Sequence, residues 1–146
     1  HNKTLITYLF KAIEHHAICT VGYYIGGMKE PELKKSETKT VIIGTYAMAS
    51  EGLDIKTLTT LIMATPKTDV CQSVGRILRT KHIQPMVIDI IDKHDLFKNQ
   101  WRKRLIYYKK QKYEIMTCDS NEYLENKWLN VSIKKPTTKK KCILTI

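Results

Sequence analysis

The chain has 146 residues, of which 42% are hydrophobic and 27% are charged, and this balance excludes an intrinsically disordered protein. The formal net charge is +11 at pH 7, which favours a polyanionic partner such as nucleic acid or nucleotide phosphates over a merely basic surface. No apolar run approaches the roughly 20 residues of a membrane helix, and no secretory signal opens the chain, so we expect an intracellular protein without a membrane partner.

Helices and strands are expected in alternation along the chain. Apolar residues at helical spacing predict the helices, and runs rich in Val, Ile, Leu and aromatic residues predict the strands. The segment 47–55 is expected to be a loop or a short helix. The expected helices span 3–17, 31–36, 69–80 and 94–112, and the expected strands span 18–25, 40–46, 58–65, 85–92 and 113–117.

The expected strands are continuous apolar runs without polar alternation, which is typical of a parallel sheet covered on both faces. We therefore predict the α/β class with one mostly parallel central sheet, and functional residues at the carboxyl ends of its strands. After residue 126 the chain becomes rich in Lys and Thr, which predicts a domain over 1–126 and a loosely held basic tail over 127–146. Four scattered cysteines argue against a zinc site or a disulfide framework.

The stretch "QSVGRILR", residues 72–79, carries the first candidate site. Arg76 and Arg79 are one helical turn apart and can point to the same side, and Gln72 lies one turn before Arg76. Planar guanidinium groups bind phosphate oxygens at two points, and a positioned arginine neutralises charge that develops during phosphoryl transfer. The alternative is an ordinary solvated basic face.

The stretch "IGTYAMASEGLDI", residues 43–55, carries the second candidate site. Thr45 follows an apolar strand, and its hydroxyl and the neighbouring backbone N–H groups can bind a sugar-phosphate chain. The carboxylate of Asp54 can accept hydrogen bonds from a ribose hydroxyl or from an arginine. The alternative is an ordinary loop with a turn at Gly52.

Together these stretches resemble the C-terminal RecA-like domain of superfamily 2 helicases, over about residues 3–113. "GTYAMASEGLDI" resembles helicase motif V, "QSVGRILR" resembles motif VI, and "YYIGGMKEPE" is similar to the strand and Gly-rich loop that lie against nucleic acid. "MVIDIIDKHDLFKNQWRKRLIYYKKQKYEI" is similar to the end of this domain in repair and transcription translocases. By the same resemblance, a strand is expected before the first helix that this sequence does not include. The most similar group is the transcript-release helicases of poxviruses and their relatives in large cytoplasmic DNA viruses.

The resemblance implies a role for individual residues. Arg76 and Arg79 would be catalytic arginines that reach the γ-phosphate of ATP. Gly52, Asp54 and Gln72 would lie in the ATP-binding region. Nucleic-acid contacts are implied for Gly27, Met28, Lys29, Thr45 and Glu51, and no residue is implied to bind a metal.

The function that the resemblance implies is the second motor domain of an ATP-dependent helicase or translocase. ATP and Mg²⁺ would be held mainly by a first RecA-like domain of the same polypeptide, because neither GxxxxGK[ST] nor a DExH box occurs here. The chain starts at His1 and is expected to be a monomeric fragment without ATPase activity of its own. Its partner would be single- or double-stranded nucleic acid, with DNA favoured. A viral protein of this kind would be found in the host cytoplasm or associated with the virion.

Two alternatives stay open. The chain could be a RecA-like module that binds nucleic acid or protein without completing an ATPase. It could also be another phosphoryl or nucleotidyl transferase, for which Asp89, Asp92 and Asp95 would supply the metal-binding carboxylates.

The basic helix predicted over 94–112 has two interpretations. Trp101, Leu105 and Tyr108 fit an apolar stripe packed on the core. The cationic side chains between them could face nucleic acid and add salt-dependent affinity. These cations are Lys103, Arg104, Lys109, Lys110 and Lys112.

Overall fold

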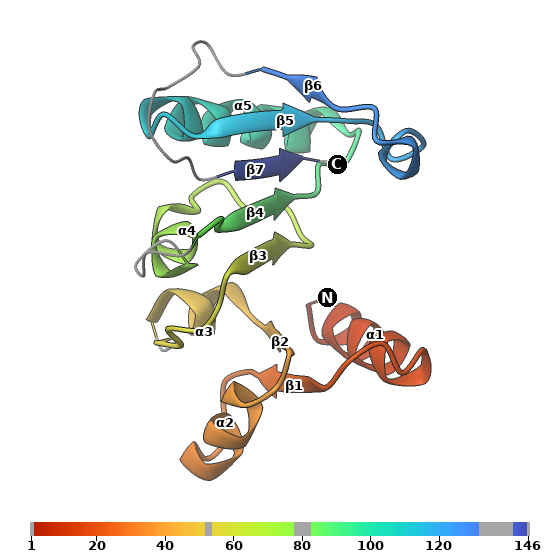
Figure 1. Cartoon of the computed structure of the whole chain (residues 1–146). Coiled ribbons are helices and arrows are strands. Elements are labelled where there is room, and N and C mark those ends of the chain that lie inside the picture. The colour runs from red at the N-terminus through yellow and green to blue at the C-terminus, as the bar shows by residue number, and fades with distance from the viewer. Residues whose placement is uncertain (1, 52–53, 78–82, 132–141, 146) are drawn as a thin grey trace. The chain divides into compact units, whose positions relative to one another are not determined.

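The computed structural model describes residues 2–51, 54–77, 83–131 and 142–145 (Figure 1). Its contacts divide the chain into two compact units, His1–Ile55 and Lys56–Ile146. Helices alternate with parallel strand pairs in both units, which confirms the predicted α/β class.

The first unit contains one pair of strands and three helices. In chain order they are α1 (Asn2–His15), β1 (Val21–Tyr24), α2 (Glu30–Glu37), β2 (Val41–Gly44) and α3 (Tyr46–Glu51). The two strands are parallel, with Val21 opposite Val41 and Tyr24 opposite Gly44. Both strands therefore end at the same edge, and the loops that follow them start side by side.

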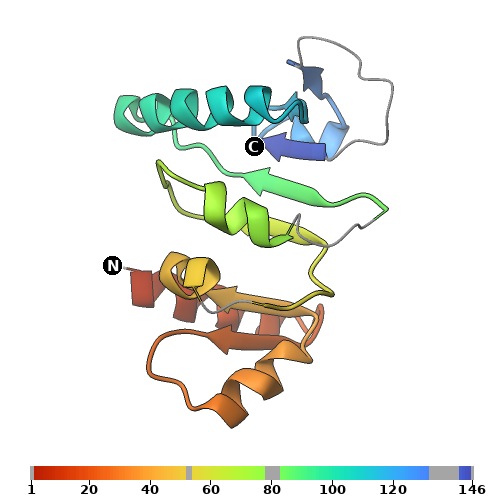
Figure 2. The ribbon, with the colours of Figure 1, turned by 90° about the vertical axis from the view of Figure 1, so that its left-hand side faces the viewer.

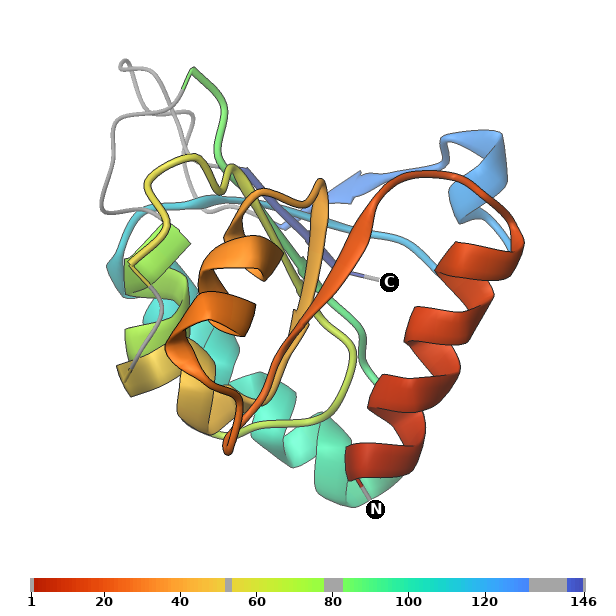
Figure 3. The ribbon, with the colours of Figure 1, turned by 90° about the horizontal axis from the view of Figure 1, so that it is seen from below.

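Successive residues of β1 face opposite sides of this strand pair, and a helix covers each side. Tyr23 stacks on Phe10 of α1, with the ring centroids 4.1 Å apart. Gly22 faces α2, where a Cβ would lie 3.0 Å from Ser36, so the missing side chain lets helix and strand approach closely. Figure 3 shows α1 and α2 on the two sides of β1 and β2.

The described part of the second unit is a five-stranded sheet with two helices. Its elements are β3 (Thr60–Met63), α4 (Cys71–Ile77), β4 (Met86–Asp89), α5 (Asp95–Lys110), β5 (Glu114–Thr117), the 3₁₀ turn η1 (Tyr123–Glu125), β6 (Leu129–Asn130) and β7 (Cys142–Thr145). Helix α4 lies between β3 and β4 in the chain, and α5 lies between β4 and β5. The strand order is β3-β4-β7-β5-β6. All neighbouring strands are parallel except β6, which is antiparallel to β5.

The core of the second unit lies between the sheet and its two helices. α4 packs beside β3 (Figure 2), and α4 and α5 lie on the same side of the sheet (Figure 3). Val87 and Asp89, two alternate residues of β4, are both buried on that side. The buried apolar side chains of this unit are Met63, Val70, Val74, Val87, Tyr108 and Ile115.

One feature differs from the sequence-based expectation. Residues 127–146, expected as a loosely held tail, contribute β6 and β7, and β7 pairs with both β4 and β5. A domain boundary at residue 126 stays a prediction. None of the helices in the described part of the chain is long and apolar enough to cross a membrane.

Candidate nucleotide and nucleic-acid site

The residues predicted to contact nucleic acid follow β1 and β2 at their common carboxyl edge. Gly27, Met28 and Lys29 lie in the loop after β1, and Thr45 directly follows β2. Since the strands end in register, the two loops leave the same edge of the strand pair. The structure therefore brings together, within the first unit, four of the residues that sequence analysis selected at two distant places in the chain.

The loop after β1 is a tight, exposed turn. The backbone N–H of Met28 donates to the carbonyl of Ile25 at 3.5 Å, and Gly27 has φ +88°, a conformation that favours glycine. Lys29 follows as the N-cap residue of α2, and its backbone N–H donates to Glu32 Oε2 at 2.8 Å. Because that hydrogen bond fixes the backbone, the exposed Lys29 side chain leaves the edge from a defined position.

Thr45 caps the short helix α3. Its Oγ1 accepts a hydrogen bond from the N–H of Met48 at 3.4 Å, and its carbonyl accepts one from Ala49 at 2.9 Å. A hydroxyl can donate one hydrogen bond while it accepts others, so capping does not prevent Thr45 from donating to a phosphate oxygen. The capping role was not predicted from the sequence.

The other residues of the second stretch are only partly described. Glu51 is the last residue of α3, and Asp54 is exposed. Gly52 lies outside the described residues, so its predicted place in the ATP-binding region stays a prediction.

Helix α4 of the second unit carries the predicted phosphate-binding residues. Val70, directly before the helix, and Val74 within it are 2% and 0% exposed and anchor it to the core. Gln72 is exposed and Arg76 is partly exposed, and residues four apart share one face of a helix. Arg79 lies outside the described residues, so its predicted alignment with Arg76 stays a prediction.

The start of α4 is fixed by a capping hydrogen bond. Asp69 Oδ1 accepts from the backbone N–H of Cys71 at 3.0 Å. Hydrogen bonding by Cys71 is the main cause that lowers the pKa of the Asp69 carboxyl below its ordinary value. The ionised form is thereby favoured at the N-terminal end of the helix, where negative charge is stabilising.

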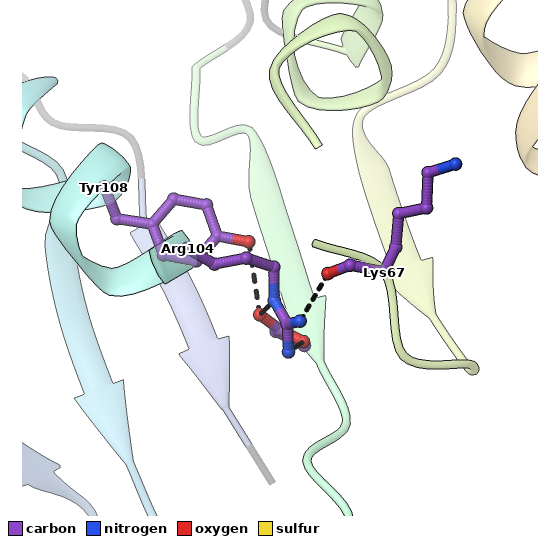
Figure 4. Close-up of polar contacts among 4 residues, drawn as sticks. Lys67, Arg104 and Tyr108 are labelled. Carbon is purple, nitrogen blue, oxygen red and sulfur yellow. Dashed lines mark hydrogen bonds and ion pairs between the residues drawn. The ribbon is translucent and has the colours of Figure 1, made fainter. Parts of the chain in front are cut away.

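A buried ion pair lies next to this region (Figure 4). Arg104 Nε and Nη2 donate to the two carboxylate oxygens of Asp89 at 2.7 and 2.9 Å, and both side chains are 2% exposed. The hydroxyl of Tyr108 donates to the same carboxylate at 3.2 Å, and Arg104 Nη1 donates to the carbonyl of Lys67. Burial raises the pKa of the Asp89 carboxyl, and the hydrogen bond and charge of Arg104 oppose that rise.

This pair corrects one prediction for the basic helix. Arg104 does not face nucleic acid, because its guanidinium is enclosed between β4 and the segment before α4. Tyr108, predicted to pack on the core, is 0% exposed, and this prediction is confirmed. The nearby cations Lys103, Lys109, Lys110 and Lys112 lie at the surface, so for these four a nucleic-acid contact stays a prediction.

Comparison with known proteins identifies the relatives of this chain. The "Putative ATP-dependent RNA helicase L396" of Acanthamoeba polyphaga mimivirus is 53% identical over 111 residues, which are 74% of this chain and 21% of that protein. The "Putative ATP-dependent RNA helicase QP509L" of African swine fever virus (isolate Pig/Kenya/KEN-50/1950) is 31% identical over 106 residues, which are 69% of this chain and 21% of that protein. This chain is a homologue of putative ATP-dependent RNA helicases of large DNA viruses.

A third relative is named as a helicase, and the matched segment is a small part of each of the three relatives. The "Putative helicase 161L" of Invertebrate iridescent virus 6 is 34% identical over 71 residues, which are 48% of this chain and 16% of that protein. The helicase homologue thus spans about a fifth of the length of the curated relatives L396 and QP509L. No family model matches the chain, and no solved structure matches it.

The side chains of the described residues differ in the ligands that they suit. Arg76 offers a guanidinium, the group best suited to phosphate oxygens. Among the described residues, no cluster of three or more His, Cys, Asp and Glu side chains could hold a metal ion. Of the three carboxylates considered for a transferase, Asp89 is paired with Arg104 and Asp95 contacts Lys98 at 3.5 Å. Two of these carboxylates therefore already contact cationic side chains.

A pocket among the described residues is separate from the residues predicted to bind ATP. It has a volume of about 350 Å³ and lies where the chain leaves β4 and β5. Its lining includes Asp92, Lys98, Trp101 and Asp119 and none of the residues predicted to bind ATP. Both acidic and basic side chains line the pocket, so its charge indicates no particular ligand.

Proposed function

We propose that this chain is the second motor domain of an ATP-dependent nucleic-acid helicase or translocase. The observation that carries the assignment is the arrangement of α4 in a homologue of viral helicases. The helix region buries Val70 and Val74 and leaves Gln72 and Arg76 at its outer side. This places a guanidinium on a helix that is held by the core, as a phosphate-contacting arginine requires.

On the nucleotide side, Arg76 and Arg79 neutralise charge on the γ-phosphate of ATP. ATP and Mg²⁺ are held mainly by a first RecA-like domain of the full protein, while Gly52, Asp54 and Gln72 complete the nucleotide contacts from this chain. Without that first domain the chain by itself does not hydrolyse ATP. The relatives named as ATP-dependent helicases support this division, because they are about five times as long as the segment they share with this chain.

On the nucleic-acid side, the carboxyl edge of β1 and β2 contacts the sugar-phosphate backbone. Lys29 supplies charge there, and Gly27, Met28, Thr45 and Glu51 shape the contact. The contact is independent of base sequence, because phosphates are alike along a strand. Two relatives are named RNA helicases, so the kind of nucleic acid is assigned by comparing RNA with DNA in the same assay.

The first test is ATP hydrolysis by the full-length protein with single-stranded RNA, single-stranded DNA or neither. Wild type is compared with Arg76→Ala and with Arg102→Ala, which removes an exposed arginine of α5 bonded to Asn99. We expect stimulated hydrolysis that falls on the order of a thousandfold in Arg76→Ala and stays near wild type in Arg102→Ala. Stronger stimulation by one of the two strands identifies RNA or DNA as the preferred partner.

Two outcomes would contradict the assignment in different ways. Stimulated hydrolysis that is unaffected by Arg76→Ala would keep the motor but remove Arg76 from the γ-phosphate. A full-length protein that binds nucleic acid but never hydrolyses ATP would be a RecA-like binding module. Arg76-dependent hydrolysis by this chain alone would show that it does not need a first domain.

The second test is the salt dependence of nucleic-acid binding. Lys29→Ala is compared with Lys35→Ala, since both remove one exposed lysine and Lys35 lies later in α2. A lost phosphate contact lowers the slope of log affinity against log salt by about 0.7 for a single strand. We expect that change for Lys29→Ala and a smaller one for Lys35→Ala. Equal slopes in both variants would show that Lys29 does not contact the nucleic-acid backbone.

A further inference from the structure

The strongest unassigned feature of the molecule is the buried pair of Asp89 and Arg104. Asp89 is the last residue of β4 and is 1% exposed, and Arg104 is 2% exposed. The pair is bidentate, and Tyr108 adds a third hydrogen bond to the carboxylate. Every oxygen of the carboxylate thus has a donor, so the pair is a fully bonded group within the core.

Arg104 also reaches outside the pair. Its Nη1 donates to the backbone carbonyl of Lys67, in the segment that connects β3 to α4 (Figure 4). One guanidinium therefore joins three parts of the second unit: β4 through Asp89, α5 through its own backbone, and the segment before α4 through Lys67. Because the contact at Lys67 is with the backbone, it fixes the path of the chain whatever side chain stands there.

The segment held by Arg104 leads directly into the helix with the phosphate-contacting residues. Lys67 lies two residues before Asp69, which caps α4, and nine residues before Arg76. We propose that the Asp89–Arg104 pair is a positioning device that sets the place of α4, and with it Arg76, relative to the ATP phosphates. This rests on the function proposed above, in which Arg76 contacts the γ-phosphate.

Stability alone explains this pair poorly. Replacing a buried ion pair by apolar residues of similar size is often neutral or stabilising, because two desolvated charges cost about as much as their attraction returns. An apolar pair could not hold a backbone carbonyl at a defined point. Lysine could not bind a carboxylate bidentately and a carbonyl at once, since it lacks the planar fork of arginine. A guanidinium that binds both a carboxylate and a backbone carbonyl thus fixes the position of the chain, which an apolar pair or a lysine would not do.

The test uses three variants of the full-length protein. Arg104→Lys keeps the charge and loses the fork. The double variant Asp89→Leu with Arg104→Met removes the pair and keeps the core apolar. Arg102→Lys makes the same exchange as Arg104→Lys at an exposed arginine of the same helix, bonded only to Asn99 among the contacts described for its guanidinium. The measurements are the stimulated kcat, the KM for ATP, the unfolding midpoint and amide hydrogen exchange over 68–77.

We expect faster exchange over 68–77 and a fall in kcat of about a hundredfold in Arg104→Lys and in the double variant, because displacement of a catalytic group by about 1 Å has that effect. The unfolding midpoint of the double variant should stay near wild type, and Arg102→Lys should match wild type in every measurement. A double variant with wild-type kcat and wild-type exchange would overturn the positioning role.

A double-mutant cycle separates positioning from general weakening. If Arg104 acts through Arg76, then Arg104→Lys has no further effect on kcat once Arg76→Ala is present. Additive losses would overturn the inference, because they would show an effect that does not pass through Arg76. If the wild-type protein hydrolyses no ATP, the proposed function fails, and hydrogen exchange over 68–77 still decides whether Arg104 holds α4.

Discussion

Gly44 lies directly opposite Tyr24 in the parallel pair of β1 and β2, and a Cβ at Gly44 would be 2.9 Å from the carbonyl oxygen of Tyr24. Real Cβ atoms do not come that close to backbone oxygen, so any larger residue must push the strands apart. Thr45 follows immediately, which means that the close approach of the strands also sets the position of a residue proposed to contact nucleic acid.

We therefore predict that Gly44→Ala destabilises the first unit by about 1–3 kcal/mol, the usual effect of overpacking a close contact. Amide hydrogen exchange of the peptides that contain β1 and β2 measures this directly. Faster exchange in both strands is expected, together with weaker nucleic-acid binding. Unchanged exchange would show that the strands can separate without loss, contrary to the geometry.

Adjacent glycines provide a matched pair for the loop after β1. No described atom lies within 4 Å of a Cβ at Gly26 or Gly27, and only Gly27 has a positive φ, of +88°. Gly27→Ala should destabilise the first unit by about 1–2 kcal/mol through backbone strain. Gly26→Ala should be neutral or stabilise by up to about 1 kcal/mol, because alanine restricts the unfolded chain. Urea unfolding of both variants checks the opposite signs, and equal effects would contradict them.

Substitution of Gly75 in α4 is expected to change stability and activity in opposite directions. It is exposed on the helix, with no described atom within 4 Å of its Cβ, and glycine in a helix costs about 1 kcal/mol relative to alanine. Gly75→Ala should raise the unfolding midpoint. We expect it to lower the stimulated ATPase, because the added methyl group stands beside Arg76, where the proposed function has a first motor domain approach. Equal or higher activity in the more stable variant would mean that nothing approaches this backbone.

Alkaline pH tests the partly buried Tyr113 of the second unit. Burial is the main cause that raises the pKa of Tyr113, and the hydrogen bond to Tyr107 adds to the rise. The neutral phenol is favoured in the folded state, so its contribution to stability is present below pH of about 10 and is lost at higher pH. Ultraviolet titration of tyrosinate should show late ionisation that disappears in urea and is reduced in Tyr113→Phe. Ionisation of all phenols near their ordinary value would contradict this.

The elements of the fold could be predicted from the sequence because apolar runs and breakers specify them locally. The strand at 40–46 and the helix at 69–80 were found within a few residues of β2 and α4. Pairing could not be predicted in the same way, since the apolar runs "MVID" and "EIMT" give no sign that another strand lies between them in the sheet. Strand β7 was missed because its short apolar run follows a Lys-rich stretch.

The candidate site shows the same division between local and long-range information. Helical spacing was sufficient to place Gln72 and Arg76 on one face of α4. The common edge of Lys29 and Thr45 depends on the pairing of β1 with β2, which the sequence did not show. Arg104 was misread, because one buried cation looks like its solvated neighbours in a basic helix. The available signal was Asp89, a lone charge within an apolar strand, which needs a partner when it is buried.

The central place of β7 has a consequence for synthesis of the protein. β4 and β5 leave the ribosome well before β7, which must later enter between them. Until then, the nascent chain has two open strand edges facing a gap one strand wide, and open edges readily pair with other chains. A protein shortened before residue 142 would keep this gap. We therefore expect such a product to aggregate during expression, although it retains every residue proposed to bind ATP or nucleic acid.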